Sequence, residues 1–211
     1  MPVFGVGSSS RSVIPGQEML ANLEDYWRRL RQSEKLPARI DIAPDEIDAA
    51  LPYCFILQHV ATGTARFRVA GQQVCDLIKM DARGMPISAL FAPAAHNDLR
   101  KMIEMTVQGP AIVGIPLVSE AKGQAASADG QMLLLPLRDQ QGQATRILGA
   151  VVARPEFGRR PRRFLIARDQ PLRHEPLGLR LAAQQLLPKA PALTKRPDAS
   201  RPALRLVVNN G

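Results

Sequence analysis

The chain has 211 residues, of which 45% are apolar, so it is long enough for one well-buried domain with an extension and leaves little room for two full domains. The formal net charge of +9 belongs to the C-terminal part, because residues 1–153 carry 15 basic and 15 acidic side chains, whereas residues 154–211 carry 13 and 4. Cys54 and Cys75 form no CxxC pair, and the N-terminus lacks the apolar run of a signal peptide, so we expect a soluble cytoplasmic protein without disulfides or a membrane span.

The first structured element is an amphipathic helix. Residues 1–17 mix glycine, serine and small apolar side chains without a period, which is typical of a flexible lead-in. Apolar side chains then recur at three- and four-residue steps up to Leu30. The apolar side chains of this stripe must be buried against another surface, and two alternatives stay open: the helix packs on its own sheet, or it packs on a second copy or a partner. The candidates for such a contact are Leu20, Leu23, Trp27 and Leu30.

A hairpin and a short helix are expected next. Pro44 and the acidic residues after it predict the start of a short helix, which ends at Leu51-Pro52. Residues 53–60 and 66–70 are rich in branched and aromatic side chains, which predicts two strands joined by a short turn over 61–64. After Gly71 the apolar spacing predicts a short helix lying back over the second strand.

A longer helix and three strands complete the predicted domain. The helix runs from Ala94 to about Gln108 and is followed by strands over 111–118, 131–138 and 145–153. Proline at 136 argues for a sheet edge or a bulge at that point. The fold class is therefore α+β: a five-stranded antiparallel sheet over residues 18–153, with helices on one face and an amphipathic helix before it.

Residues 154–211 differ in character from the rest of the chain. They contain 8 of the 18 prolines and the excess of arginine, so we expect a largely irregular tail, with apolar islands at 177–187 and 204–208 that need a partner surface. The arginine run has two interpretations: contacts to the phosphates of nucleic acid or of an anionic membrane, or a solvated linker. The arginines concerned are Arg159, Arg160, Arg162 and Arg163.

Motifs for catalysis are missing from the sequence. It contains no nucleophile elbow, phosphate loop or dinucleotide fingerprint, and its three scattered histidines lack metal-ligand spacing. We therefore predict neither an enzyme nor a metal site.

Several segments carry a family resemblance. The central segment is RFRVAG, followed by a short helix with a cysteine and then by RGMPISALF, which ends at Phe91. Two segments precede it, YWRRLR and LPARIDIAPDEIDAALPYCFIL. Two more follow it, MLLLPLRD and RILGAVV. In this order they resemble the stand-alone PAS-domain family common in alphaproteobacteria, over roughly two thirds of the chain. The resemblance implies a sensory or regulatory domain for signal transduction, acting through protein–protein interaction, ligand-dependent or constitutive.

The resemblance also implies where a ligand would bind. The pocket would lie between the sheet and the helices, and its candidates are Phe67, Val69, Val74, Cys75, Leu77, His96, Leu99 and Ile103. PAS haem sensors place a proximal histidine on the helix flanking the pocket, as His96 is placed here, and Cys75 invites comparison with flavin-binding PAS domains, although their GxNCRFLQ signature is absent. We predict no cofactor. The expected partner is a signalling protein or a second copy, with a small ligand possible in the pocket and nucleic acid as the alternative through the tail.

Overall fold

The computed structural model describes residue 14 and residues 16–31, 35–122, 126, 128–155 and 160–178. All of them belong to the unit Met1–Leu181. Nearly all of the predicted lead-in, most of the first apolar island and all of the second lie outside the described residues. In the part of the chain that is described, no helix is long and apolar enough to cross a membrane.

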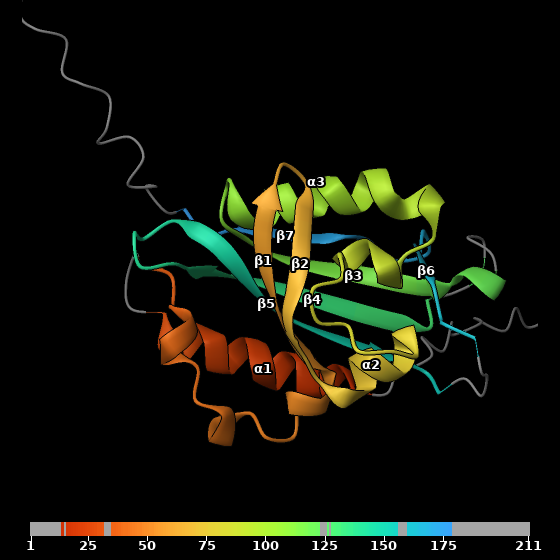
Figure 1. Cartoon of the computed structure of the whole chain (residues 1–211), viewed down its shortest axis with the longest axis horizontal. Coiled ribbons are helices and arrows are strands. Elements are labelled where there is room, and N and C mark those ends of the chain that lie inside the picture. Colours follow the sequence, from red (N-terminus) through yellow and green to blue (C-terminus); the bar gives the residue numbers. More distant parts are fainter. Residues whose placement is uncertain are drawn as a thin grey trace, which may run out of the picture. The chain divides into compact units, whose positions relative to one another are not determined.

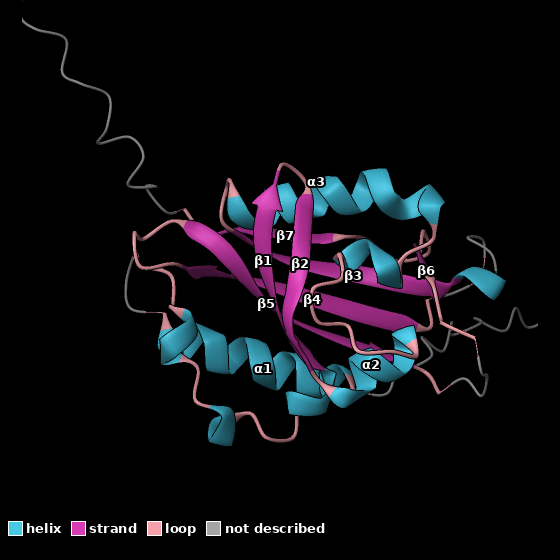
Figure 2. Ribbon diagram, viewed as in Figure 1, coloured by secondary structure: helices cyan, strands magenta, loops and turns pink. Residues whose placement is uncertain are grey.

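An antiparallel sheet forms the centre of the fold (Figures 1 and 2). Five strands follow the prediction and lie in the order β2-β1-β5-β4-β3. They are β1 (Cys54–Ala61), β2 (Thr64–Ala70), β3 (Ala111–Ser119), β4 (Gly130–Arg138) and β5 (Ala144–Ala153). Every residue of β3 is buried. α3 packs on the strand, β4 pairs with one of its edges, and β6 and β7 pair with the other edge.

The sheet contains two more strands than the five predicted. β6 (Phe164–Ile166) and β7 (Arg173–Pro176) both pair antiparallel with β3, on the edge away from β4. They come from the segment predicted to be largely irregular. Its composition cannot build a core of its own, but the free edge of β3 offers backbone partners, and Phe164 is fully buried against the sheet.

Helices cover both faces of the sheet. α1 (Gln17–Leu30) packs on β4 and β5, and α3 (His96–Val107) packs on β3, β4 and β5 from the opposite side (Figure 1). α2 (Gln72–Ile78) follows β2. Short 3-10 helices complete the set: η1 (Arg39–Asp41), η2 (Pro44–Glu46), η3 (Leu51–Tyr53), η4 (Ile87–Leu90), η5 (Pro93–Ala95) and η6 (Glu120–Lys122). The helix expected from Pro44 is thus a pair of 3-10 turns.

The apolar stripe of α1 is buried within its own chain. Leu20, Leu23 and Trp27 are buried, and Leu30 packs partly against the core. The Trp27 indole donates a hydrogen bond of 3.2 Å to the carbonyl of Pro136. These four side chains therefore pack on their own sheet, and a partner could contact them only after α1 had moved away.

Proline at 136 predicted a sheet edge or a bulge, and Pro136 lies in the central strand β4 close to a register irregularity. It pairs with Ile147 of β5 within β4, just beyond the last β3–β4 pair, Val113 with Leu134, and a register irregularity follows it. Its missing N–H consequently interrupts no hydrogen bond to β3, and its carbonyl is used by Trp27.

Candidate functional site

Half of the predicted pocket residues are packed in the core between the sheet and the helices. Phe67, Val74, Leu99 and Ile103 are 0 to 2% exposed. The Phe67 ring meets Phe55 edge to face, with the ring centroids 5.4 Å apart. These side chains fill the space that the resemblance assigned to a ligand.

Val69 does not face the core. It lies on the edge strand β2 and is 48% exposed. The pairing of β2 with β1 shifts by one residue between the pairs Ile56–Val69 and Leu57–Phe67, so β2 carries one extra residue there. This irregularity breaks the two-residue alternation and turns Val69 away from the face of Phe67.

The remaining space near α3 is a small cleft. Its volume is about 180 Å³, and it lies between the β1–β2 turn, residues 86–88 and α3. Of the predicted pocket residues, His96, Leu99 and Ile103 line it. Ligand pockets commonly have 300–1,000 Å³, so this cleft is too small for a drug-sized molecule.

Haem or flavin does not fit this cleft. Nε2 of His96, which the haem interpretation needs as the ligand, lies 3.2 Å from the carbonyl oxygen of Phe91. A porphyrin or flavin ring would also have to displace Leu99 and Ile103 from the core. The partly buried Cys75 packs against the same core.

The helix α3 is tied to the β1–β2 hairpin by Glu104. Its Oε1 lies 2.9 Å from Nε2 of His59 and also accepts the N–H of Gly63. Burial opposes ionisation of Glu104, but the hydrogen bonds from Gly63 and His59 outweigh it, so the pKa of this carboxyl is lowered. The hairpin and α3 are therefore coupled by a charge-dependent contact.

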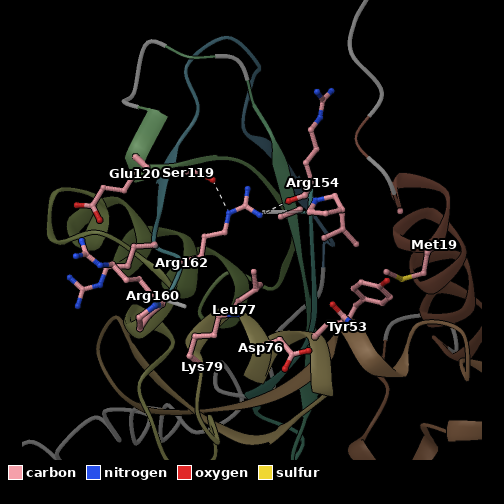
Figure 3. A pocket seen from close by; sticks show the side chains of 18 of the residues that line it. Met19, Tyr53, Asp76, Leu77, Lys79, Ser119, Glu120, Arg154, Arg160 and Arg162 are labelled. Carbon is pink, nitrogen blue, oxygen red and sulfur yellow. Dashed lines mark hydrogen bonds between the residues drawn. The ribbon is translucent and has the colours of Figure 1, made fainter. Parts of the chain in front are cut away.

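A larger groove opens at the other end of the sheet. It has a volume of about 1150 Å³ and is lined by the start of α1, η3, α2, the ends of β3 and β5, and residues 160–163. Figure 3 shows Arg162 in its middle, with Met19 and Tyr53 on one side and Arg160 and Lys79 on the other. Leu77 is the one predicted pocket residue that lines it.

Arg162 is held in place by a buried polar cluster. Its guanidinium donates to the Ser119 hydroxyl at 2.7 Å, to Asp129 at 3.1 Å and to the Arg154 carbonyl at 2.5 Å. It also lies 4.9 Å from the ring centroid of Phe164. Since its side chain is only 10% exposed, Arg162 is a structural residue of the sheet end and is not the solvated charge that one interpretation of the arginine run expected.

Asp129 is the acidic centre of this cluster. Its side chain is 3% exposed, and it accepts the backbone N–H and the hydroxyl of Ser119 and pairs with Lys122 at 2.8 Å. Burial raises the pKa of this carboxyl, but the contacts with Lys122, Ser119 and Arg162 lower it by more. The aspartate therefore stays charged and anchors the segment that leads to β6.

The other predicted tail contacts differ from Arg162. Arg160 and Arg163 are exposed and line the groove, and neither has an ion-pair partner among the residues that the structure describes. Arg159 lies outside the described residues. Two of the four arginines are thus placed where they can meet an anionic ligand.

A second charged cluster joins α1 to β7. Arg173 contacts both oxygens of Glu24, at 2.6 and 2.8 Å, and Arg28 contacts Glu24 at 2.7 Å. Glu175 completes the cluster with contacts of 2.6 to 2.8 Å to both arginines. Burial opposes ionisation of Glu24, yet the two arginines outweigh it and lower the pKa of this carboxyl. This cluster fixes β7 against α1.

Sequence reasoning missed both charged clusters. A signal existed for one pair only, because Glu24 and Arg28 have the i, i+4 spacing of a helical ion pair. Asp129 follows a small, polar turn, and nothing nearby in the sequence connects it with Arg162. Their contact becomes visible only when β6 is placed beside β3.

The fold defines an α+β domain with an antiparallel sheet whose long crossover, containing α2 and α3, covers one face. The model of the PAS domain family matches residues 17–152, more than half of the sequence, and the chain belongs to this family. No curated protein and no solved structure matches the chain. At the level of the family, PAS domains are sensory and regulatory modules.

Proposed function

We propose that this PAS domain is a non-catalytic regulatory module of the cytoplasm that acts in signal transduction by contact with a protein partner or a second copy, without a cofactor in its core. One observation carries the proposal: the space between sheet and α3 is filled by Phe67, Val74, Leu99 and Ile103. What remains there is the cleft of about 180 Å³.

The contact between α3 and the hairpin offers a route for the signal. Glu104 joins α3 to His59 of β1 and Gly63 of the turn, while the buried side of the helix packs on β3, β4 and β5. A partner that prefers one position of α3 would therefore shift the hairpin as well.

Absorbance from about 300 to 700 nm and the native mass of freshly purified protein test the absence of a cofactor. We expect a colourless protein whose mass equals the bare chain or twice that value. A Soret or flavin band would refute the proposal and would direct attention to His96→Ala and Cys75→Ala.

A matched pair of tryptophan variants tests the role of α3. Ile103→Trp overpacks the core under α3, whereas Lys101→Trp adds the same side chain on the exposed side of the helix. Overpacking costs about 1–3 kcal/mol. Because a displaced α3 no longer matches the partner, we expect recovery of the bound partner in quantitative affinity purification to fall by about tenfold for Ile103→Trp and to stay unchanged for Lys101→Trp. Equal recovery with a folded Ile103→Trp protein would contradict the proposed route.

Contact with nucleic acid is a second candidate function, favoured by the exposure of Arg160 and Arg163. Truncation at Arg154 would remove β6 and β7 from the sheet, so the cleaner test is the pair Arg160→Ala and Arg163→Ala. If the tail binds phosphates, the wild-type chain retains DNA or RNA at low salt, and the double variant has weaker binding with a smaller salt dependence.

A further inference from the structure

The groove beside Arg162 separates an apolar side from a basic side. Met19 of α1 and Tyr53 of η3 lie on one side of Arg162, and Lys79 and Arg160 lie on the other (Figure 3). Val152 of β5 contributes further apolar surface. A ligand that fills this groove therefore meets apolar surface at one end and positive charge at the other.

The charge of the lining is clearly positive. Of the residues that the structure describes, five basic and two acidic side chains line the groove. One of the acids, Glu120, points away from Arg162 in Figure 3, and Asp76 is hydrogen-bonded to Gln72. Arg160, Arg163 and Lys79 have no ion-pair partner within the described ranges. The basic side is thus able to bind an anionic group.

The terminal segments of the chain are poor in acidic residues. Residues 182–211 contain five basic side chains and one acidic one, and residues 1–13 contain one arginine and no acid. By composition, neither segment offers a cluster of acidic side chains. We therefore consider a separate molecule as the source of the anion.

Nucleic acid fits this groove poorly. Among the described residues that line the groove, Tyr53 is the one aromatic side chain, and single-stranded nucleic acid is commonly held by several stacked aromatic residues. A phosphate backbone also has no apolar group that could pack against the apolar side of the groove. An anion with an apolar body can contact both the basic and the apolar side.

We propose that this groove is a binding site for an amphipathic small anion, with its carboxylate or phosphate at Arg160 and Arg163 and its apolar body against Met19, Tyr53 and Leu77. The volume of about 1150 Å³ accommodates a molecule of this class. The site is separate from the filled cleft at α3 and goes beyond the proposed function, because it needs no protein partner.

Isothermal titration calorimetry of the full chain tests the proposal. The ligands are dodecanoate and dodecyl phosphate, each below its micelle-forming concentration, and dodecyltrimethylammonium as the cation of equal chain length. We expect saturable binding of at least one anion, with the cation at least about tenfold weaker. The tighter of the two anions identifies the head group. Equal binding of the cation, or no binding of either anion, would overturn the proposal.

Variants locate the binding. The loss of one charge-assisted hydrogen bond to the ligand weakens its binding by about tenfold or more. We therefore expect at least this loss of affinity for the double variant Arg160→Ala with Arg163→Ala. Arg68→Ala, an exposed arginine of β2 outside the groove, serves as the matched control and should leave the affinity unchanged. Lys79→Ala provides a third basic position should the double variant fold poorly. Affinity that is insensitive to both the double variant and Lys79→Ala would refute the site, as would tighter binding of a hexaglutamate peptide than of either anion.

Discussion

Side chains fill most of the space at one end of the domain and leave a groove open at the other. At α3, the residues predicted to surround a ligand pack against each other and leave a cleft of about 180 Å³. At the end of β3 and β5, residues predicted to be part of an irregular tail complete a groove of about 1150 Å³. Apolar periodicity thus predicts which side chains are buried, but it does not predict where space remains.

The largest effect is expected at the buried anchor of the groove. Asp129→Ala leaves the guanidinium of Arg162 without its carboxylate in a site where the two side chains are 10% and 3% exposed. Breaking a buried pair in this way costs about 3–5 kcal/mol. Urea denaturation, with Asp98→Ala on the exposed side of α3 as the control, measures the loss. A cost under about 1 kcal/mol would show that the cluster does not hold the 160–163 segment.

A pair of leucine variants compares the two ends directly. Leu99 is 2% exposed in the core, whereas Leu77 is only partly buried beside the groove. We expect Leu99→Ala to lower the free energy of unfolding by about 2–4 kcal/mol and Leu77→Ala by about 1 kcal/mol. Similar losses would mean that the core at α3 is less tightly packed than its exposures indicate.

The cluster between α1 and β7 should contribute less. Glu24→Gln removes the charge shared by Arg28 and Arg173, whose side chains are 36% and 47% exposed. Because water screens these arginines, we expect a loss of about 1 kcal/mol, measured by urea denaturation at low and at high salt. Glu18→Gln, at the exposed start of α1, is the control. A loss that does not shrink with added salt would contradict an electrostatic origin.

The smallest effect is a pH dependence at α3. The pKa of Glu104 is lowered in the folded chain, so its stabilising contribution is complete above the ordinary value of 4.5 and is lost as the pH falls through the folded value. Below about pH 4.5, Glu104→Gln should therefore differ from the wild type progressively less in thermal stability. Glu120→Gln, at an exposed position of η6, is the control. A difference for Glu104→Gln that grows toward acid pH would contradict the assignment.

Much of the fold was predictable because its elements have strong local signals. The apolar stripe of α1, the hairpin around Gly63 and the apolar runs of β3 to β5 predicted an α+β domain with an antiparallel sheet, and the structure confirms that class. β6 and β7 have only three and four residues, and their stability comes from the edge of β3 rather than from their own sequence. No local pattern predicts such strands.

The site was less predictable, for two physical reasons. Val69 followed the alternation of β2 in sequence, but the extra residue opposite Ile56 and Leu57 reversed its direction. Arg162 lies among prolines and arginines in the sequence, which indicated a solvated charge. Only the pairing of β6 with β3 brings it to Asp129 and Ser119. Contacts between distant segments decided both cases.

The most direct test of the contrast between the groove and the filled cleft is a titration of the ¹⁵N-labelled chain with dodecanoate and dodecyl phosphate, followed by two-dimensional NMR. We expect the amide signals of Leu77, Lys79 and Arg163 to shift to saturation while those of His96 and Ile103 stay in place. Shifts confined to His96 and Ile103 would place the ligand site in the cleft at α3 and refute the groove as the binding site.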